Sequence, residues 1–180
     1  MLSPEKKEIK IVALGDSITR CFGVDPWTDT VTAKSRYKII NKGIGGETLK
    51  QMNNRLQRDV ISLKPDVAII LGGTNDAFYS NFDADKSMNE IHSIAKRLEK
   101  AGIHPIVGIP LPILNKKYDD RLSKLRDKIL TSKYSIINFH WDFTIPEAKK
   151  ILPDNVHPNK KGKDIMAERV IMDLDRIFGE

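Results

Sequence analysis

The sequence predicts an α/β protein: a three-layer α/β/α sandwich with a five-stranded parallel sheet, flavodoxin-like in type. Two observations predict this fold class. Short runs rich in β-branched residues alternate along the chain with longer segments that carry apolar residues at helical spacing. The short runs are also apolar at consecutive positions, as in "DVAIIL" and "PIVGIP". That pattern is typical of parallel strands covered by helices on both faces.

Each element is predicted from its own stretch of chain. The runs expected to form strands are residues 9–14, 37–41, 66–71, 104–110 and 135–140. The segments expected to form helices are residues 48–62, 85–101, 118–133 and 160–178. In the second of these helices Met88, Ile91 and Leu98 recur at helical spacing, and Gly102 stands where a C-terminal capping glycine belongs.

Length and composition indicate one globular domain over residues 1–180, because 40% hydrophobic content supports a sizeable core. The formal net charge is +6, but basic and acidic residues are interleaved, as in "KLRDKI". This favours a solvated basic surface. The sequence contains no aromatic RNA-binding motif, paired zinc ligands or basic block, so we expect no nucleic-acid partner.

The redox and membrane signals are weak. Cys21 is the only cysteine, which excludes an intrachain disulfide and a cysteine-rich metal site. The start "MLSPEKKEIK" lacks the apolar core of a signal peptide, and no run approaches the ~18 apolar residues of a transmembrane helix. We therefore expect a cytoplasmic protein without membrane insertion, unless a leader has been removed.

Polar segments follow four of the five predicted strands. These are "GDSIT", "NKGIGGET", "GGTNDAF" and, before the last helix, "PDNVHPNKKG". Ligands of parallel α/β sheets bind outside the carboxyl ends of the strands. We therefore expect these four segments to converge in space.

Three residues in these segments suit nucleophilic catalysis. Asp154 and His157 are three residues apart, so one turn of chain can aim the carboxylate at one imidazole nitrogen. The other nitrogen is then free to act as the general base for the hydroxyl of Ser17. The alternatives are that Ser17 is a helix N-cap and that His157 is a loop histidine before Pro158.

Acyl transfer also needs donors for the oxyanion, and two segments offer them. Gly45 and Gly46 can expose backbone amides, and Asn75 has a side-chain amide. The alternatives are an ordinary turn glycine at Gly46 and, at Asn75, a residue that closes a turn with Asp76.

The four segments resemble the four sequence blocks of the SGNH hydrolases, also called the GDSL lipase/esterase/acylhydrolase family. The resemblance runs in the correct order from Gly15 to Pro158, and its second block opens at Asn41. Two positions depart from the family pattern: Ile18 stands where the family name has Leu, and Asn155 where Gly is frequent. The resemblance implies a single SGNH hydrolase domain that uses neither a cofactor nor a metal.

The resemblance also implies roles for five residues. Ser17 is the expected nucleophile, with Asp154 and His157 completing a catalytic triad. The amides of Ser17 and Gly46 and the side chain of Asn75 form the expected oxyanion hole.

The predicted activity is that of a serine esterase or acylhydrolase that forms an acyl-enzyme on Ser17. Its expected substrates are small molecules that carry short- to medium-chain acyl esters or thioesters. A carbohydrate O-acetylesterase with the same mechanism is the first alternative. A metal-dependent phosphoesterase and a non-catalytic binding module are alternatives from other classes.

Five residues are candidates for substrate binding. Phe78, Tyr79, Leu111 and Ile113 lie in the two loops available to shape a shallow apolar groove. The alternative is that these side chains pack within their own loops. Asp16 is the fifth candidate, although we expect it, like Asp76, to brace its loop by accepting backbone hydrogen bonds.

Overall fold

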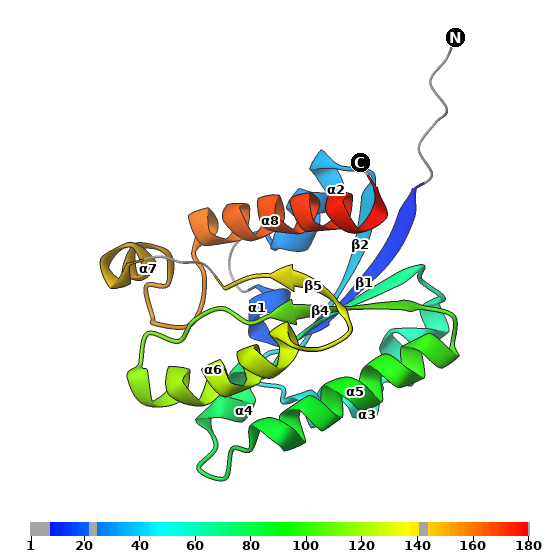
Figure 1. Cartoon of the computed structure of the whole chain (residues 1–180). Coiled ribbons are helices and arrows are strands. Elements are labelled where there is room, and N and C mark those ends of the chain that lie inside the picture. The colour runs from blue at the N-terminus through cyan, green and yellow to red at the C-terminus, as the bar shows by residue number, and fades with distance from the viewer. Residues whose placement is uncertain (1–7, 22–24, 141–143, 180) are drawn as a thin grey trace.

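A five-stranded parallel sheet lies at the centre of the fold (Figure 1). The structure is a computed structural model and describes residues 8–21, 25–140 and 144–179. The strands are β1 (Ile9–Gly15), β2 (Tyr37–Gly43), β3 (Val67–Leu71), β4 (His104–Ile109) and β5 (Ser135–Asn138), and their order across the sheet is β2-β1-β3-β4-β5.

Helices cover both faces of this sheet. They are α1 (Ser17–Arg20), α2 (Trp27–Lys34), α3 (Leu49–Asp59), α4 (Thr74–Phe78), α5 (Ala84–Lys100), α6 (Lys116–Leu130), α7 (Ile145–Ile151) and α8 (Lys160–Phe178), with a 3-10 helix at Ile61–Leu63. Helices α2 and α8 lie on one face, and α3, α5 and α6 lie on the other (Figure 1). The predicted three-layer α/β/α sandwich with a five-stranded parallel sheet is confirmed.

The strands are apolar at consecutive positions because each face of the sheet has its own core. In β1, Ile11 and Ala13 face the core beneath α2 and α8, whereas Val12 and Leu14 face the core beneath α3 and α5. All four side chains are at most 1% exposed. A two-sided core leaves no polar face on the strand, which explains the sequence pattern.

Four helices were not predicted from the sequence: α1, α2, α4 and α7. The sequence of α2, "WTDTVTAK", is rich in β-branched residues with modest helix propensity. Its helix is stabilised by burial of Trp27 and Val31, and the Trp27 ring packs 5.5 Å from that of Phe139. Tertiary packing therefore overrides local propensity here. The α3 helix also ends at Asp59, three residues before the predicted end at 62.

The ends of β1 and β2 lie side by side, and this positions the first two polar segments. Gly15 pairs with Gly43 in the parallel register, and the Ile44 N–H donates to the Gly15 carbonyl at 3.0 Å. A Cβ on Gly15 would lie 2.9 Å from the Leu71 carbonyl oxygen of β3. Only glycine therefore fits between the neighbouring strand end and the turn that follows.

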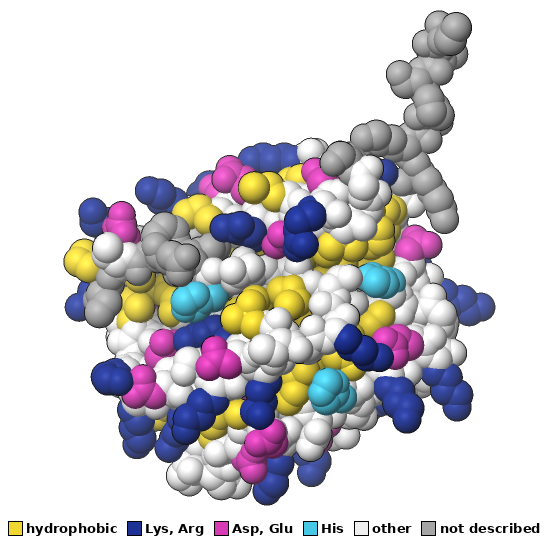
Figure 2. Space-filling view, in the orientation of Figure 1, with side chains coloured by type: hydrophobic (Ala, Val, Ile, Leu, Met, Phe, Trp, Pro, Cys, Tyr) yellow, Lys and Arg dark blue, Asp and Glu magenta, His cyan; other side chains and the backbone are white. Residues whose placement is uncertain are grey.

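Basic and acidic side chains are interspersed on the face shown in Figure 2, as the interleaved sequence predicts. Across the described residues, no helix has both the length and the apolar character required to cross a membrane.

Candidate active site

Ser17 is the first residue of α1, directly after β1. The helix N-cap is Asp16, whose Oδ1 accepts a hydrogen bond from the Ile18 N–H at 2.9 Å. The alternative that Ser17 is the N-cap is therefore wrong. Its hydroxyl instead lies 2.8 Å from Nε2 of His157, a residue 140 positions away in the sequence.

The imidazole of His157 is held from its other side by Asp154. The distance from Nδ1 to Asp154 Oδ2 is 2.7 Å. The second carboxylate oxygen, Oδ1, accepts the backbone N–H groups of Val156 at 3.0 Å and His157 at 2.7 Å. Both oxygens of the Asp154 carboxylate thus accept hydrogen bonds. The Ser17 hydroxyl, the His157 imidazole and the Asp154 carboxylate are linked in this order by hydrogen bonds.

This short turn also sets the ionisation of Asp154. Partial burial acts to raise its pKa, but hydrogen bonds from the backbone and ring of His157 and the backbone of Val156 hold the pKa below its usual value. Asn155, between them, has a φ of 72°, a conformation that favours glycine and that asparagine tolerates better than most residues. This conformation explains why asparagine can stand at a position where the resemblance leads us to expect glycine.

The segments that carry Gly46 and Asn75 meet beside Asp16. Asn75 lies in the first turn of α4, and its Nδ2 donates to the Glu47 carbonyl at 2.9 Å and lies 3.5 Å from Asp16 Oδ2. Gly46 has a φ of +79° and is exposed, and its amide has no hydrogen-bond acceptor among the residues that the structure describes. The turn therefore favours a glycine, and its N–H group is not used by any hydrogen bond among the described residues.

Asp16 and Asp76 brace these loops, as predicted. Asp16 is only 1% exposed, and burial raises its pKa to about 7 despite the hydrogen bond from the Ile18 N–H. Asp76 Oδ2 accepts the Leu49 N–H at 3.1 Å, and burial raises the pKa of this carboxyl as well. The further prediction that Asp16 contacts substrate is wrong, because its side chain is not accessible.

Leu111 and Ile113 do not line a groove, so their prediction as substrate-binding residues is also wrong. They are 1% and 3% exposed, and they pack into the cores on opposite faces of the sheet. The segment after β4 packs against the cores on both faces of the sheet, so its apolar side chains are buried and do not reach a ligand. Phe78 and Tyr79 remain at the surface, 38% and 58% exposed, and the Phe78 ring contacts that of Tyr118 edge-on.

A small cavity of about 220 Å³ opens beside the Ser17 hydroxyl and the His157 ring. Its lining residues are Ser17, Cys21, Asp154, His157, Pro158 and Lys163. Lys163 was not predicted as a site residue. The available signal was its position on the buried stripe of α8, four residues before Ala167 and seven before Val170, where a lysine interrupts an apolar pattern.

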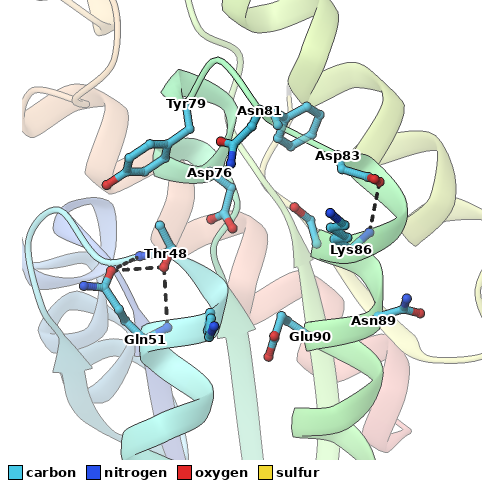
Figure 3. Close-up of a pocket in the computed structure, with 12 residues that line it drawn as sticks. Thr48, Gln51, Asp76, Tyr79, Asn81, Asp83, Lys86, Asn89 and Glu90 are labelled. Carbon is cyan, nitrogen blue, oxygen red and sulfur yellow. Dashed lines mark hydrogen bonds between the residues drawn. The ribbon is translucent and has the colours of Figure 1, made fainter.

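A larger cavity of about 570 Å³ lies between the start of α3, the end of α4 and the start of α5. In Figure 3 the carboxylate of Asp76 projects into its centre, with Thr48 and Gln51 on one wall and Lys86 and Glu90 on the other. Tyr79 and Asn81 lie above them. Of this lining, Tyr79 was predicted as a substrate-binding residue and Asp76 as a loop brace. Most of the other lining residues are polar side chains of a helix surface or a loop, whose sequence carries no signal for a site.

The phosphoesterase alternative would require a cluster of metal ligands. Among the residues that the structure describes, no group of three His, Cys, Asp or Glu side chains is placed to hold a metal ion. The carboxylates of Asp16 and Asp154, which stand in the polar segments after the strands, are engaged by backbone N–H groups.

The comparison with protein families identifies the class of this fold and site. The model of the GDSL-like lipase/acylhydrolase family matches residues 13–165, so the chain belongs to this family. The predicted membership of the SGNH hydrolases is confirmed.

The chain is also similar to individual curated proteins. The chain is 24% identical over 207 residues to an acetylxylan esterase of Xylanibacter ruminicola, covering 92% of this chain and 43% of that protein. It is 30% identical over 119 residues to the uncharacterized lipoprotein YqeF of Bacillus subtilis, covering 58% of this chain and 49% of that one. The aligned regions thus span less than half the length of these relatives.

Solved structures confirm the fold. A lipolytic protein of the G-D-S-L family from Desulfitobacterium hafniense has a TM-score of 0.76 at 23% identity, covering 92% of this chain and 99% of that one. Axe2, an acetylxylan esterase from Geobacillus stearothermophilus, has a TM-score of 0.74 at 20% identity, covering 92% and 94% of the two chains.

Proposed function

We propose that the protein is a serine esterase or acylhydrolase that forms an acyl-enzyme on Ser17. The observation that carries this proposal is the continuous line from Ser17 Oγ through the ring of His157 to Asp154, with distances of 2.8 Å and 2.7 Å. A hydroxyl paired with an imidazole that a carboxylate orients is the arrangement that makes serine a nucleophile near neutral pH.

In the acylation step, Nε2 of His157 accepts the Ser17 proton while Oγ attacks the ester carbonyl carbon. Asp154 stabilises the imidazolium that forms, and its hydrogen bonds from two backbone N–H groups keep it in place. When the tetrahedral intermediate collapses, His157 donates the proton to the leaving alcohol. The acyl group then remains on Ser17.

The negative charge of the tetrahedral oxygen needs donors that are already in position. The proposed donors are the backbone N–H groups of Ser17 and Gly46 and the side-chain amide of Asn75. Nδ2 of Asn75 donates to the Glu47 carbonyl at 2.9 Å, which orients the amide. Its second hydrogen bond, to Asp16 Oδ2, is long at 3.5 Å, and the substrate oxygen would replace Asp16 as the acceptor of that N–H.

Deacylation repeats the same proton transfers with water. His157 removes a proton from a water molecule, which attacks the acyl carbon and releases the acid and the free Ser17 hydroxyl. These residues carry out each proton transfer of the cycle, and the proposal includes no cofactor.

The larger cavity favours esters of polar alcohols, including the carbohydrate O-acetylesterase alternative. Its walls share two segments with the proposed oxyanion hole: Asp76 follows Asn75, and Thr48 lies two residues after Gly46. Most of its lining side chains are amides, hydroxyls, carboxylates or lysines, with Tyr79 and Phe82 as the aromatic ones, and this composition suits a polyhydroxylated group better than an acyl chain. Acetylxylan esterases among the relatives support the same choice.

The proposal is tested with Ser17→Ala and a matched control, Ser62→Ala, whose hydroxyl lies in the 3-10 helix before β3. Both variants and the native protein are assayed with para-nitrophenyl esters of rising acyl length and with acetylated xylose. We expect Ser17→Ala to lose nearly all turnover and labelling by a fluorophosphonate, and Ser62→Ala to retain both.

Substantial turnover by Ser17→Ala would overturn the nucleophile assignment. Equal cleavage of aryl acetates and acetylated sugars would contradict the preference for polar alcohols. The cytoplasmic location stays a prediction, which cell fractionation tests.

A further inference from the structure

Lys163 is a buried lysine in the cavity that contains the proposed nucleophile. Lys163 is 4% exposed, and it lines the 220 Å³ cavity together with Ser17 and His157. It lies in the first turns of α8, which begins three residues after His157. The proposed catalytic cycle gives this ammonium group no role.

No acidic side chain described in the structure forms an ion pair with Lys163, although the neighbouring Lys160 is paired with Asp164 at 3.2 Å. The Lys163 ammonium lies beside the Cys21 thiol. Burial raises the pKa of this thiol, and the ammonium acts in the opposite direction. A sulfur atom does not neutralise a cation as a carboxylate does. Burying an ammonium without a carboxylate partner is costly, so an anionic group that enters the cavity would meet a positive charge that no carboxylate among the described residues neutralises.

The surroundings of Lys163 also favour an anion. The first turn of α8 contains no acidic residue, and the N-terminal end of this 19-residue helix carries partial positive charge. The carboxylate that lines the cavity, Asp154, has both oxygens engaged by His157 and backbone N–H groups. These contacts satisfy Asp154, so Lys163 is the lining residue that can offer a positive charge to an anionic group in the cavity.

We propose that Lys163 is a specificity-determining residue that binds an anionic group, a carboxylate or an equivalent oxyanion, of the ester substrate while the ester carbonyl lies at Ser17. This inference rests on the proposed esterase function. It assigns the protein to esters that carry a negative charge within a few bonds of the scissile linkage, because a cavity of about 220 Å³ holds a small group only.

The test compares pairs of esters that differ in charge but little in shape. Para-acetoxybenzoate and para-acetoxybenzamide place the difference on the alcohol side. Para-nitrophenyl hemisuccinate and para-nitrophenyl succinamate place it on the acyl side. For each pair the ratio of kcat/KM values, anionic over neutral, is measured in the native protein, in Lys163→Met and in Lys161→Met. Lys161 is an exposed lysine of the same helix turn, so its variant controls for net charge.

We expect at least one ratio to fall about tenfold in Lys163→Met, since a hydrogen bond between charged groups is lost, and to stay unchanged in Lys161→Met. Lys163→Arg should keep most of the native ratio. The pair that responds identifies the side of the ester that carries the anion. If neither ratio changes in Lys163→Met, the inference is overturned. Turnover of the neutral esters in the same experiment would leave the proposed function intact.

Two further measurements keep these outcomes separate. Absence of turnover for all four esters would contradict the proposed function itself. In that case Ser17→Ala is used to measure binding, and para-acetoxybenzoate should raise its melting temperature more than para-acetoxybenzamide does. Equal shifts would overturn the inference independently. If Lys163→Met does not fold, Lys163→Gln replaces it in the same comparison.

Discussion

The buried carboxyl of Asp16 should make the stability of this protein depend on pH in a measurable way. Asp16 is 1% exposed, and burial raises its pKa from 3.8 to about 7. For a carboxyl whose folded-state pKa is raised, the linked stability is fully present below the unfolded-state pKa and is lost as pH rises through the folded-state pKa. The expected window therefore runs from about pH 4 to about pH 7.

The magnitude follows from the same two values. Multiplying the difference between about 7 and 3.8 by about 1.36 kcal/mol per pH unit gives about 4 kcal/mol. The substitution Asp16→Asn removes the ionisation and keeps an oxygen for the Ile18 N–H, which Asp16 accepts at 2.9 Å. Its new amide hydrogens face Nδ2 of Asn75, a cost of about 1 kcal/mol that is the same at every pH.

The assay is urea unfolding of the native protein and Asp16→Asn at several pH values from about 4 to 8.5. We expect the variant to gain stability relative to the native protein as pH rises, by up to about 4 kcal/mol across this range. The control is Asp120→Asn, which removes an exposed carboxylate paired with Lys116 on the surface. A stability difference for Asp16→Asn that stays constant with pH would refute the reasoning.

Three other predictions concern catalysis and packing. Asn75→Ala should lower kcat by about 10² to 10³ with little change in KM, because the Asn75 amide binds charge that is present only in the transition state. Steady-state kinetics with a para-nitrophenyl ester test this, and a change confined to KM would indicate that Asn75 positions the substrate instead. Gly15→Ala should lower the melting temperature by an amount equivalent to roughly 1 to 3 kcal/mol, because its Cβ would lie 2.9 Å from the Leu71 carbonyl, and an unchanged melting temperature would contradict that contact. EDTA should leave ester hydrolysis unaffected, whereas loss of turnover that zinc or magnesium restores would favour the phosphoesterase alternative.

Local sequence determined much of the architecture. Runs that are apolar at consecutive positions need a core on each face, so the strands and the three layers followed from pattern alone. The contact between Asp154 and His157 was also predictable, because three residues of chain bring the two side chains together at 2.7 Å. The short α1 and α4 helices were missed because each is one turn formed where a strand ends, too short to show a helical period.

The tertiary structure decided which side chains reach the site and which are buried. Ser17 and His157 meet across 140 residues only because the sheet order brings the end of β1 beside the turn before α8. Leu111 and Ile113 were predicted as groove residues but belong to the cores, and Lys163, which was not predicted as a site residue, lines the cavity beside Ser17. The physical reason is that a single apolar or charged residue in a loop or helix has the same identity whether its side chain meets solvent, a core or a cavity. Only the packing of elements that are distant in sequence decides which of the three it meets.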